Sequence, residues 1–585
     1  MRIILRLTVF VRKYWAWLLL AFVALLASTG FNLVIPRMVG DAIDTAISAG
    51  EKSFLFVAAA VVVGAAALRG IAEFGNRFIA EAVSQKVAYD IRNAIFERLQ
   101  RLSFAYHDQA QTGQLMSRAT ADVEAIRMFF GMGLIGIVQL VIMLVAISVI
   151  LLTLNWQLAL LTLAFMPAIG WRAVVVSDRL RPMWLHIQEL IAALGTVLEE
   201  SLTGIRVVKA FSRQSVESKK FSDQATILYN SHIGVARIQA FNMPLMAFLM
   251  ALPMTVILWY GGRQVVAGTL TIGEITQFIM YVSLLVMPIR RLGMLANQVS
   301  RTYSAGLRVF EILDSESAVK EKPGAIVLGK VKGQVSFENV SFSYDSMAPT
   351  VENISFDVQP GELVALLGGS GSGKSTLANL VSRFYDVTEG SITIDGVDIR
   401  DVTLDSLRSN VGIAQQDIFL FSTTIRKNIA YGVVNADMEQ IEAAAKAAHL
   451  HDFILTLPDG YDTWVGERGL TLSGGEKQRL AIARTLLINP SVLILDDSMS
   501  AVDAETESLI RQALAKLIEG RTTFIITHRL PIIKNANLIL MLDKGKIVEM
   551  GNHNELMAKE GLYYHTYQSQ LMTDDHSGDD AEITL

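Results

Sequence analysis

Six long apolar runs in about the first 300 residues constrain the fold of this chain more than any other feature of its sequence. The runs lie at about residues 14–36, 54–76, 128–153, 155–175, 240–261 and 273–296. Each is close to the roughly 20 residues that a helix needs to cross the apolar core of a bilayer. Only 18% of all residues are charged, against about 25% in a typical soluble domain, and the deficit falls on this part of the chain. The sequence therefore predicts an α-helical membrane domain with six spans.

The first apolar run follows a basic N-terminus, which is also typical of a cleaved signal peptide. Arg2, Arg6, Arg12 and Lys13 precede the run, which continues to about Pro36. Signal peptides have apolar regions of about 7–15 residues, and further spans follow this one. We therefore favour a first transmembrane helix, with a signal peptide as the alternative.

The loops between the spans differ in length and charge. Long segments rich in arginine and lysine separate runs two and three and runs four and five, whereas the turn around Asn155 has no basic residue. The positive-inside tendency places the long loops and both termini in the cytoplasm. Both loops are helical in pattern and are expected to extend the spans, with bends around Gly113–Asp122 and Gly204–Phe211. Arg69 and Glu73, four residues apart in run two, are expected to pair.

The second half of the chain has the composition of a soluble α/β domain. A polar stretch with Pro323 and Gly324 follows the last span, and strands then alternate with helices, as in a parallel sheet flanked by helices. We predict a membrane domain at 1–310, a linker at 311–333, an α/β domain at 334–570 and a disordered acidic tail at 571–585. The net charge of −5 gives no sign of nucleic-acid binding, and the absence of cysteine excludes disulfides and thiolate metal sites.

A glycine-rich loop in the α/β domain follows an apolar strand at Leu363–Leu367 and opens a helix. The loop consists of Gly368, Gly369, Ser370, Gly371, Ser372, Gly373, Lys374 and Ser375. It fits the phosphate-binding pattern G-x-x-x-x-G-K-[ST], in which the glycines let backbone N–H groups surround phosphates. Lys374 would neutralise the β- and γ-phosphates, the Ser375 hydroxyl would bind Mg²⁺, and Thr376 completes the candidate nucleotide-binding residues. A plain glycine- and serine-rich loop is the alternative, which the flanking strand and helix disfavour.

Two further segments fit an ATP-hydrolysing site. The apolar strand Val492–Leu495 ends in Asp496, and an aspartate at this place holds Mg²⁺ in phosphate-loop enzymes. The other segment, between the loop and this strand, consists of Ser473, Gly474, Gly475 and Glu476. A Ser-Gly-Gly turn that opens a helix favours a second anion-binding site at the helix N-terminus. A simple helix N-cap at Ser473 is the alternative interpretation.

The run Leu472–Glu476 resembles the signature sequence of ABC ATPases, and the resemblance covers almost the whole chain. It implies that Tyr344 stacks on adenine and that Gln416 senses and contacts Mg²⁺. It further implies that Asp497 orients the attacking water and that His528 contacts the γ-phosphate, so Asp497, His528 and Gln416 are the candidate catalytic residues. Shorter matches to the family lie at Val465–Glu467, Ser500–Asp503, Thr112–Asp122 and Gly204–Phe211.

These matches together resemble a half-size ABC exporter. One chain carries one phosphate loop, one signature and six spans, so the resemblance implies a dimer in which each ATP lies between the loop of one subunit and the signature of the other. It implies ATP-driven export of a hydrophobic or amphipathic drug, lipid or peptide across the inner (plasma) membrane, with the ATPase domain in the cytoplasm. An importer on the same fold and a ligand-gated channel or regulator remain as alternatives.

Two positions depart from the family pattern. The signature ends in Glu476 where the family has glutamine, which adds a negative charge near a triphosphate. The acid after Asp496 is Asp497 where the family has glutamate, and a carboxylate that falls short by roughly 1 Å can lower a rate on the order of 10²-fold. We therefore predict a degenerate site and favour a heterodimer with a second half-transporter, with a homodimer as the other possibility. The alternative for Asp497 is slow hydrolysis through an added water.

Methionines recur at helical spacing in the last two spans. They are Met243, Met246, Met250 and Met254 in one span and Met280, Met287 and Met294 in the other. Because methionine side chains are flexible and polarizable, these stripes favour an adaptable binding cavity, and ordinary helix packing is the alternative. Arg290 and Arg291, near the inner end of the last span, would attract an anionic head group or mark the cytoplasmic interface.

Overall fold

The structure, a computed structural model, consists of two compact units. It describes residues 2–49, 52–344, 348–414, 418–466, 469, 471–496, 504–527 and 530–579. We call residues 1–100 and 112–315 the helical unit, and residues 101–111 and 316–585 the α/β unit. A short segment from the first half of the chain therefore belongs to the α/β unit.

Six helical stretches of the chain are long and apolar enough to cross a membrane. They are Trp15–Ile47, Phe56–Arg101, Thr112–Leu154, Trp156–Thr203, Gln214–Val266 and Ile272–Asp314. Each stretch contains one of the six apolar runs, so the predicted set of six spans is confirmed. Stretches two and four continue well beyond the ends of their apolar runs, and stretches three and five begin well before theirs. The helical pattern of the two long loops predicted these extensions.

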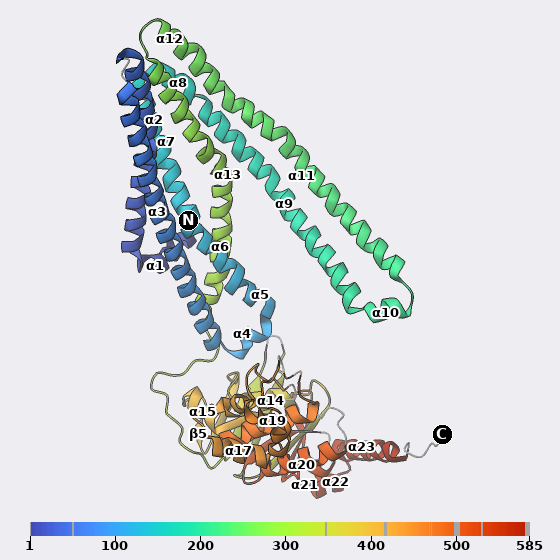
Figure 1. The fold of residues 1–585 in the computed structure, drawn as a ribbon. Coiled ribbons are helices and arrows are strands. Elements are labelled where there is room, and N and C mark those ends of the chain that lie inside the picture. The colour runs from blue at the N-terminus through green and yellow to red at the C-terminus, as the bar shows by residue number, and fades with distance from the viewer. Residues whose placement is uncertain are drawn as a thin grey trace. The chain divides into compact units, whose positions relative to one another are not determined.

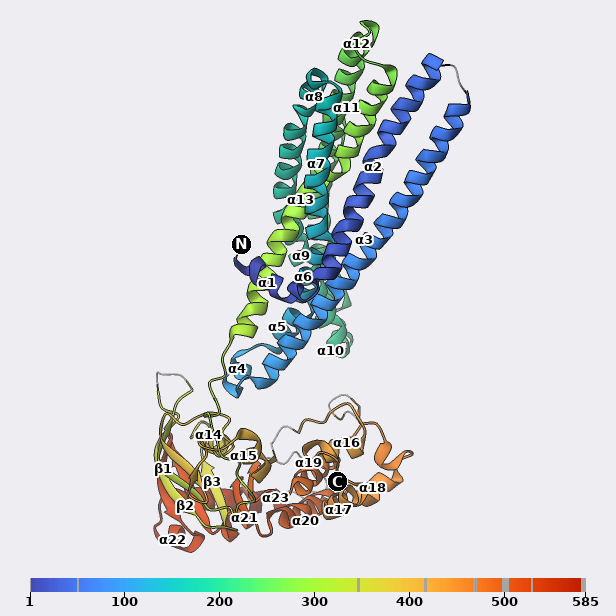
Figure 2. The same cartoon turned by 90° about the vertical axis from the view of Figure 1, so that its left-hand side faces the viewer.

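The helical unit contains α-helices interrupted by short π-helical turns. In chain order these elements are α1 (Arg2–Arg12), α2 (Trp15–Ala49), α3 (Lys52–Arg101), α5 (Thr112–Ser117), η1 (Arg118–Asp122), α6 (Val123–Met128), η2 (Phe129–Gly133), α7 (Leu134–Leu154), α8 (Trp156–Leu163), α9 (Phe165–Thr203), α10 (Ile205–Ala210), α11 (Gln214–Val256), η3 (Ile257–Gly261), α12 (Gly262–Val266) and α13 (Ile272–Asp314). Helices α9 and α11 run side by side and are joined through α10, as Figure 1 shows. Helix α13 lies beside α2, α7 and α9 (Figure 2).

One of the two predicted bends is confirmed and the other is displaced. The turn around α10 falls within the predicted Gly204–Phe211. The other predicted bend, Gly113–Asp122, is wrong because these residues are helical and form α5 and η1. The chain bends earlier, around α4 (Phe104–Gln109), where Ser103 and Ala110 have extended backbone on either side of the helix. A glycine near the start of a helix is tolerated, so Gly113 was a poor marker of the turn.

The charged residues inside the second span pair as expected, although a neighbour pairs more closely. Arg69 Nε lies 4.0 Å from Glu73 Oε2. Arg77 Nη2 donates to Glu73 Oε1 at 2.6 Å. Glu73 is thus shared between two arginines, one turn before it and one turn after it, which lowers the cost of keeping a carboxylate in this helix.

The α/β unit contains two sheets. Its strands are β1 (Val335–Phe342), β2 (Val351–Val358), β3 (Leu363–Gly368), β4 (Glu389–Ile394), β5 (Val397–Asp398), β6 (Val411–Ala414), β7 (Val492–Asp496), β8 (Thr522–Ile526), β9 (Leu538–Asp543) and β10 (Lys546–Gly551). The larger sheet has the order β10-β9-β3-β8-β7-β6 and is parallel from β9 to β6, as the alternation of strands and helices predicted. The smaller sheet, β2-β1-β4-β5, is antiparallel.

The parallel sheet is covered on both faces. The helices of the unit are α4, α14 (Lys374–Val381), α15 (Leu404–Asn410), α16 (Ile425–Ile429), α17 (Met438–Ala447), α18 (His451–Thr456), α19 (Gly474–Ile488), α20 (Ala504–Ile518), α21 (Leu530–Asn535), α22 (His553–Ala558) and α23 (Leu562–Asp579), with 3-10 turns η4 (Ala430–Gly432) and η5 (Gly460–Asp462). Alternate residues of β3 enter two different buried clusters, since Ala365 and Leu367 join one that includes α17, α19 and α20, and Val364 and Leu366 join one that includes α14 and the smaller sheet. Strands of this kind are buried on both faces. Figure 2 shows β1, β2 and β3 at one side of the unit and α16 to α19 at the other.

The C-terminal tail is helical further than its composition predicted. Helix α23 ends at Asp579 and so includes residues 571–579, for which we expected disorder. Low hydrophobicity argues against burial in a core, but it does not prevent helical hydrogen bonding along a segment that continues an existing helix.

Candidate functional site

The sheet topology brings the predicted phosphate loop and the predicted metal-binding aspartate to one edge. Strands β3 and β7 both run parallel to β8, which lies between them. The loop after Gly368 and the side chain of Asp496 therefore emerge at the carboxyl ends of next-but-one neighbours. This edge is where open parallel sheets bind ligands.

The glycines of the loop are required by its backbone conformation. Gly368, Gly371 and Gly373 have φ angles of 144°, 77° and 102°, which residues with a side chain rarely adopt. A Cβ atom on Gly368 would lie 2.2 Å from the Leu542 carbonyl oxygen, and a Cβ on Gly373 would lie 2.7 Å from Val351 Cγ1. The loop is thus packed closely against neighbouring strands, while Gly369 and Ser370 are exposed.

The loop lysine is held at the mouth of this cradle. Lys374 is the first residue of α14, and its Nζ donates to the carbonyl oxygens of Gly368 and Gly369 at 2.9 and 2.8 Å. Burial lowers the pKa of Lys374, and the negative charge of Asp496 opposes that shift. The predicted phosphate-neutralising ammonium and the predicted Mg²⁺ ligand therefore lie at the same edge of the sheet.

The hydroxyl groups of the loop also fit a phosphate ligand. Ser372 is 4% exposed, and its Oγ has no hydrogen-bond partner in the described part of the chain. Ser375, in the first turn of α14, is exposed. A buried hydroxyl without a partner is costly unless a ligand or water satisfies it. The Ser372 hydroxyl is therefore free to donate a hydrogen bond to a phosphate oxygen. The donor set of Lys374, Ser375 and Asp496 fits a nucleotide with its metal.

Tyr344 lies where it can stack on a base. The residue is 46% exposed, and its hydroxyl lies 3.2 Å from Thr376 Oγ1 in the first turn of α14. The ring also contacts Phe342 at 4.9 Å and Tyr385 at 5.1 Å between centroids. An exposed aromatic residue beside the phosphate loop is compatible with adenine stacking, and this role of Tyr344 stays a prediction.

The predicted signature forms the start of a helix. Ser473 is the N-cap of α19, its Oγ accepts from Glu476 N at 3.4 Å, and Glu476 Oε2 accepts from Ser473 N at 2.8 Å. The two interpretations of this segment are therefore compatible, because the N-cap also presents the helix N-terminus to an anion. Gly475 is buried, and a Cβ there would lie 2.2 Å from Thr506 Cγ2 of α20. Ser473 and Gly474 are exposed.

Within the described part of the chain, the hydrogen bonds of Ser473 and Glu476 stay inside this first turn, and none joins them to the phosphate loop. Three predicted catalytic residues, Gln416, Asp497 and His528, lie outside the described residues. The same holds for Glu467 and for the predicted interface loop Ser500–Asp503. Their roles stay predictions.

Sequence reasoning missed a group of residues around α4. Phe104 of α4 stacks on Phe384 with 4.0 Å between ring centroids, and Tyr385 donates a hydrogen bond to Asp108. Arg383, which directly precedes Phe384, is 1% exposed. The signal that could have marked them is the run of an arginine, two aromatic residues and an aspartate directly after the helix that begins at the phosphate loop.

A phosphate loop between a parallel strand and a helix, with an aspartate at the end of a nearby strand, defines a phosphate-loop ATPase domain. Six candidate spans in the same chain define a membrane transporter driven by such a domain. Comparisons with known proteins give the family. Residues 18–289 match the family model described as ABC transporter transmembrane region, and residues 351–500 match the family model described as ABC transporter.

Curated proteins and solved structures agree with these matches. The chain is 39% identical over 561 residues to the uncharacterized ABC transporter ATP-binding protein YknU of Bacillus subtilis (strain 168), which covers 96% of this chain and 95% of that protein. It is 36% identical to an ATP-dependent lipid A-core flippase of Thiobacillus denitrificans, over 97% and 98% of the two chains. The structure of a bacterial Atm1-family ABC exporter with ATP bound matches with a TM-score of 0.78 and 33% identity, over 95% and 98% of the two chains.

The chain belongs to the ABC transporters, as a half-size exporter that carries its transmembrane region and its ATPase domain in one polypeptide. It is a multi-pass membrane protein that hydrolyses ATP in a cytoplasmic domain to drive export. Half-size exporters of this family generally form dimers.

Proposed function

We propose that this chain binds Mg·ATP at the phosphate loop and works as one half of a heterodimeric exporter in the inner (plasma) membrane. The geometry of the loop supports the nucleotide site: Lys374 begins α14 after β3, Asp496 ends β7 at the same edge of the sheet, and the Tyr344 hydroxyl lies beside Thr376 of α14. Bound Mg²⁺ would neutralise charge on the phosphates. Ser375 and Asp496 are the residues that would hold the ion, with Gln416 as the further predicted ligand.

The single observation that carries the heterodimer is the acid after the metal-binding aspartate. Asp497 follows Asp496 where the family pattern has glutamate. In a homodimer both sites would contain the shorter acid and both would be slow, since a misplacement of about 1 Å can cost on the order of 10²-fold in rate. In a heterodimer, the site built on this chain's Lys374 and Asp497 holds ATP and turns over slowly. The other site uses this chain's Ser473, Gly474 and Gly475 and hydrolyses ATP on the partner.

The test is to express the chain alone and together with its genomic neighbour, and to measure ATPase activity of each purified preparation. We expect normal activity only in the pair. Within the pair, Asp497→Asn should change the rate little, and replacing the partner's catalytic acid by its amide should nearly stop it. A stable dimer of this chain alone with full transport-coupled ATPase activity would show that the heterodimer is wrong.

The reverse substitution sharpens the argument about the short acid. Asp497→Glu restores the family residue, so it should raise ATP turnover of this chain's own site by up to about 10²-fold. Lys374→Ala in the same background removes the phosphate contact and should cancel that gain. An unchanged rate in Asp497→Glu would show that the length of this acid does not limit turnover.

For the substrate we propose a hydrophobic or amphipathic compound. Similar proteins include lipid A-core flippases and a putative multidrug export protein, YgaD of Bacillus subtilis, which is 38% identical over 92% of this chain. Met287 and Met294 of the last span are 56% and 73% exposed, and Met243 of the fifth span is 62% exposed. Met246, Met250 and Met254 pack instead against a buried cluster. Of the methionines predicted to line a binding cavity, we therefore propose the exposed Met243, Met287 and Met294 as the residues that contact substrate.

Spin labels or crosslinkers at Met243, Met287 and Met294 test whether these positions line the central cavity of the assembled transporter. Labels that stay in a lipid environment in every nucleotide state would exclude a role in binding. A screen for ATPase stimulation by drugs, lipids and peptides in the reconstituted complex then identifies the substrate class. Uptake of the stimulating compound into inverted vesicles on addition of ATP separates export from import.

A further inference from the structure

The segment around α4 has an unusual place in the chain. It is flanked in sequence by α3, which ends the second spanning stretch, and by α5, which begins the third. Residues 101–111 nevertheless belong to the α/β unit by their contacts. Any change in the α/β unit that moves α4 therefore acts directly on the ends of two spans.

Two adjacent aromatic residues hold α4 in the α/β unit. Phe384 stacks on Phe104 with 4.0 Å between ring centroids and an angle of 24° between the ring planes. Tyr385 donates a hydrogen bond from its hydroxyl to Asp108 Oδ2. Phe384 is in turn covered by the guanidinium of Arg408, 5.4 Å from the ring centroid. Phe384 supplies apolar contact, whereas Tyr385 supplies a directional hydrogen bond.

Tyr385 also contacts the aromatic residue predicted to bind adenine. Its ring lies 5.1 Å from the ring of Tyr344 at an angle of 87°, and 5.3 Å from the ring of Phe342. Edge-to-face contacts of this kind stabilise a defined relative orientation of two rings. Tyr344 reaches the phosphate helix through Thr376. Tyr385 therefore joins α4 on one side to the base platform on the other.

The environment of Tyr385 suits a fixed link. The residue is 7% exposed. Burial raises the pKa of its phenol, and the hydrogen bond to the Asp108 carboxylate raises it further. The phenol therefore stays protonated and remains a donor, and a hydrogen bond to a charged acceptor is stronger than one between neutral groups. A rigid ring with one strong bond at its end transmits a rotation that a flexible chain would absorb.

We propose that Tyr385 is a positioning residue that links the occupation of the base site at Tyr344 to the placement of α4. The inference rests on the proposed nucleotide site. A base stacked on the exposed face of Tyr344 restricts that ring, the ring restricts Tyr385 through their edge-to-face contact, and the hydroxyl of Tyr385 holds Asp108. The position of α4 therefore responds to binding of the nucleotide base rather than to binding of its phosphates.

Hydrogen–deuterium exchange of the purified full-length transporter tests the link. Exchange is followed in peptides that cover α4 and in peptides that cover the phosphate loop. Mg·AMP-PNP is compared with Mg·tripolyphosphate, which offers phosphates without a base. In the wild type we expect AMP-PNP to slow exchange in α4 by about tenfold, which corresponds to about 1.4 kcal/mol, and tripolyphosphate to leave α4 unchanged.

Three variants give the comparison. Tyr385→Phe keeps the ring and removes the donor, and Asp108→Asn keeps an acceptor of lower charge. Tyr461→Phe is the matched control, because Tyr461 is also 7% exposed and also has a hydroxyl bonded to a side chain, 2.8 Å from His451 Nδ1. We expect Tyr385→Phe to lose the slowing at α4 and to keep it at the phosphate loop. Asp108→Asn should retain part of it, and Tyr461→Phe should behave as the wild type.

Two results would overturn the proposal: equal slowing of α4 in Tyr385→Phe and the wild type, or equal slowing of α4 by tripolyphosphate and AMP-PNP. A general loss of stability in Tyr385→Phe would speed exchange at the phosphate loop as well, so it is separated from loss of the link by that second peptide. The nucleotide site itself is tested by the same data. If AMP-PNP fails to slow exchange at the phosphate loop of the wild type, the proposed function fails, whatever α4 does.

Discussion

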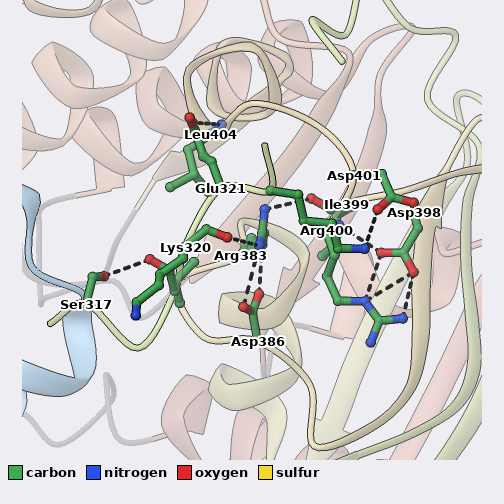
Figure 3. Close-up of polar contacts among 12 residues, drawn as sticks. Ser317, Lys320, Glu321, Arg383, Asp386, Asp398, Ile399, Arg400, Asp401 and Leu404 are labelled. Atoms are coloured by element: carbon green, nitrogen blue, oxygen red, sulfur yellow. Dashed lines mark hydrogen bonds and ion pairs between the residues drawn. The ribbon is translucent and has the colours of Figure 1, made fainter. Parts of the chain in front are cut away.

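Arg383, the buried arginine that precedes Phe384 and Tyr385, offers a quantitative test of how the linker is attached to the α/β unit. Arg383 is 1% exposed, and its guanidinium makes bonds to three different groups (Figure 3). Nε donates to Asp386 Oδ1 at 2.7 Å. Nη2 donates to the carbonyl oxygen of Lys320 in the linker at 2.9 Å, and Nη1 donates to that of Ile399 at 3.2 Å. Arg383→Met keeps a long apolar side chain and removes all these donors.

The expected loss follows from these contacts. Removing one partner of a buried ion pair costs about 3–5 kcal/mol because the other charge stays behind. The side chain of Asp386 is 31% exposed and can regain water, so the lower end applies, and we expect the free energy of unfolding of the α/β unit to fall by about 3 kcal/mol. The linker itself loses one charge-assisted hydrogen bond, worth about 1.5–3 kcal/mol. It stays attached nearby, where Glu321 Oε1 accepts from Leu404 N at 2.7 Å.

Limited proteolysis measures this attachment directly. Trypsin cleaves after Lys320, whose carbonyl is the one that Arg383 holds. If opening of the linker is fast compared with cleavage, the cleavage rate follows the open population, and the loss of about 1.5–3 kcal/mol predicts cleavage about 10 to 150 times faster in Arg383→Met. Chemical denaturation of the same protein reports the larger, global loss.

A neighbouring pair provides the control. Arg400 and Asp398 form an ion pair at 2.6 Å with side chains 33% and 20% exposed, and Figure 3 shows it beside Arg383. Among the residues that the structure describes, the hydrogen bonds of Arg400 go to Asp398, and none reaches the linker. Arg400→Met should therefore change stability by less than about 1 kcal/mol and leave cleavage after Lys320 nearly unchanged. Equal cleavage rates in the two variants would refute the claim that Arg383 anchors the linker.

Four further substitutions test the site and its support. Lys374→Met should lower ATPase activity by about 10²–10³-fold, yet thermal unfolding should occur at the same or a higher temperature, because burial lowers the pKa of Lys374 and its charge therefore opposes folding. Gly475→Ala should destabilise by about 1–3 kcal/mol through the 2.2 Å approach to Thr506 Cγ2, and Thr506→Ser, which removes that methyl group, should restore most of it. Burial lowers the pKa of His553 below 6.5, so the unfolded state binds a proton first as pH falls and stability should drop below about pH 6.5. His553→Gln should flatten that slope in unfolding measured between about pH 5 and 7.

Much of the architecture was predictable because it rests on local patterns. Six apolar runs give six spans, and the order of strand, glycine-rich loop and helix gives the phosphate cradle around Lys374. The bend near α4 was misplaced because Gly113 is a weak signal inside a helix, whereas the turn is made by extended backbone at Ser103 and Ala110. The contact of Tyr385 with Asp108 joins residues 277 positions apart, and no periodicity or motif in one sequence encodes such a pair.

The sequence also did not predict that the residues following one helix of the α/β unit contact both the linker and α4. Helix α14 begins at Lys374 in the phosphate loop and ends at Val381, and Arg383 and Tyr385 follow within one turn of its end. Arg383 holds the linker that continues α13, and Tyr385 holds α4 between α3 and α5. An eight-residue helix is about 12 Å long, so its two ends lie close together. If nucleotide binding tilts α14, we expect the Arg383 bond to the linker and the Tyr385 bond to α4 to shift together, because both side chains follow the end of the same helix.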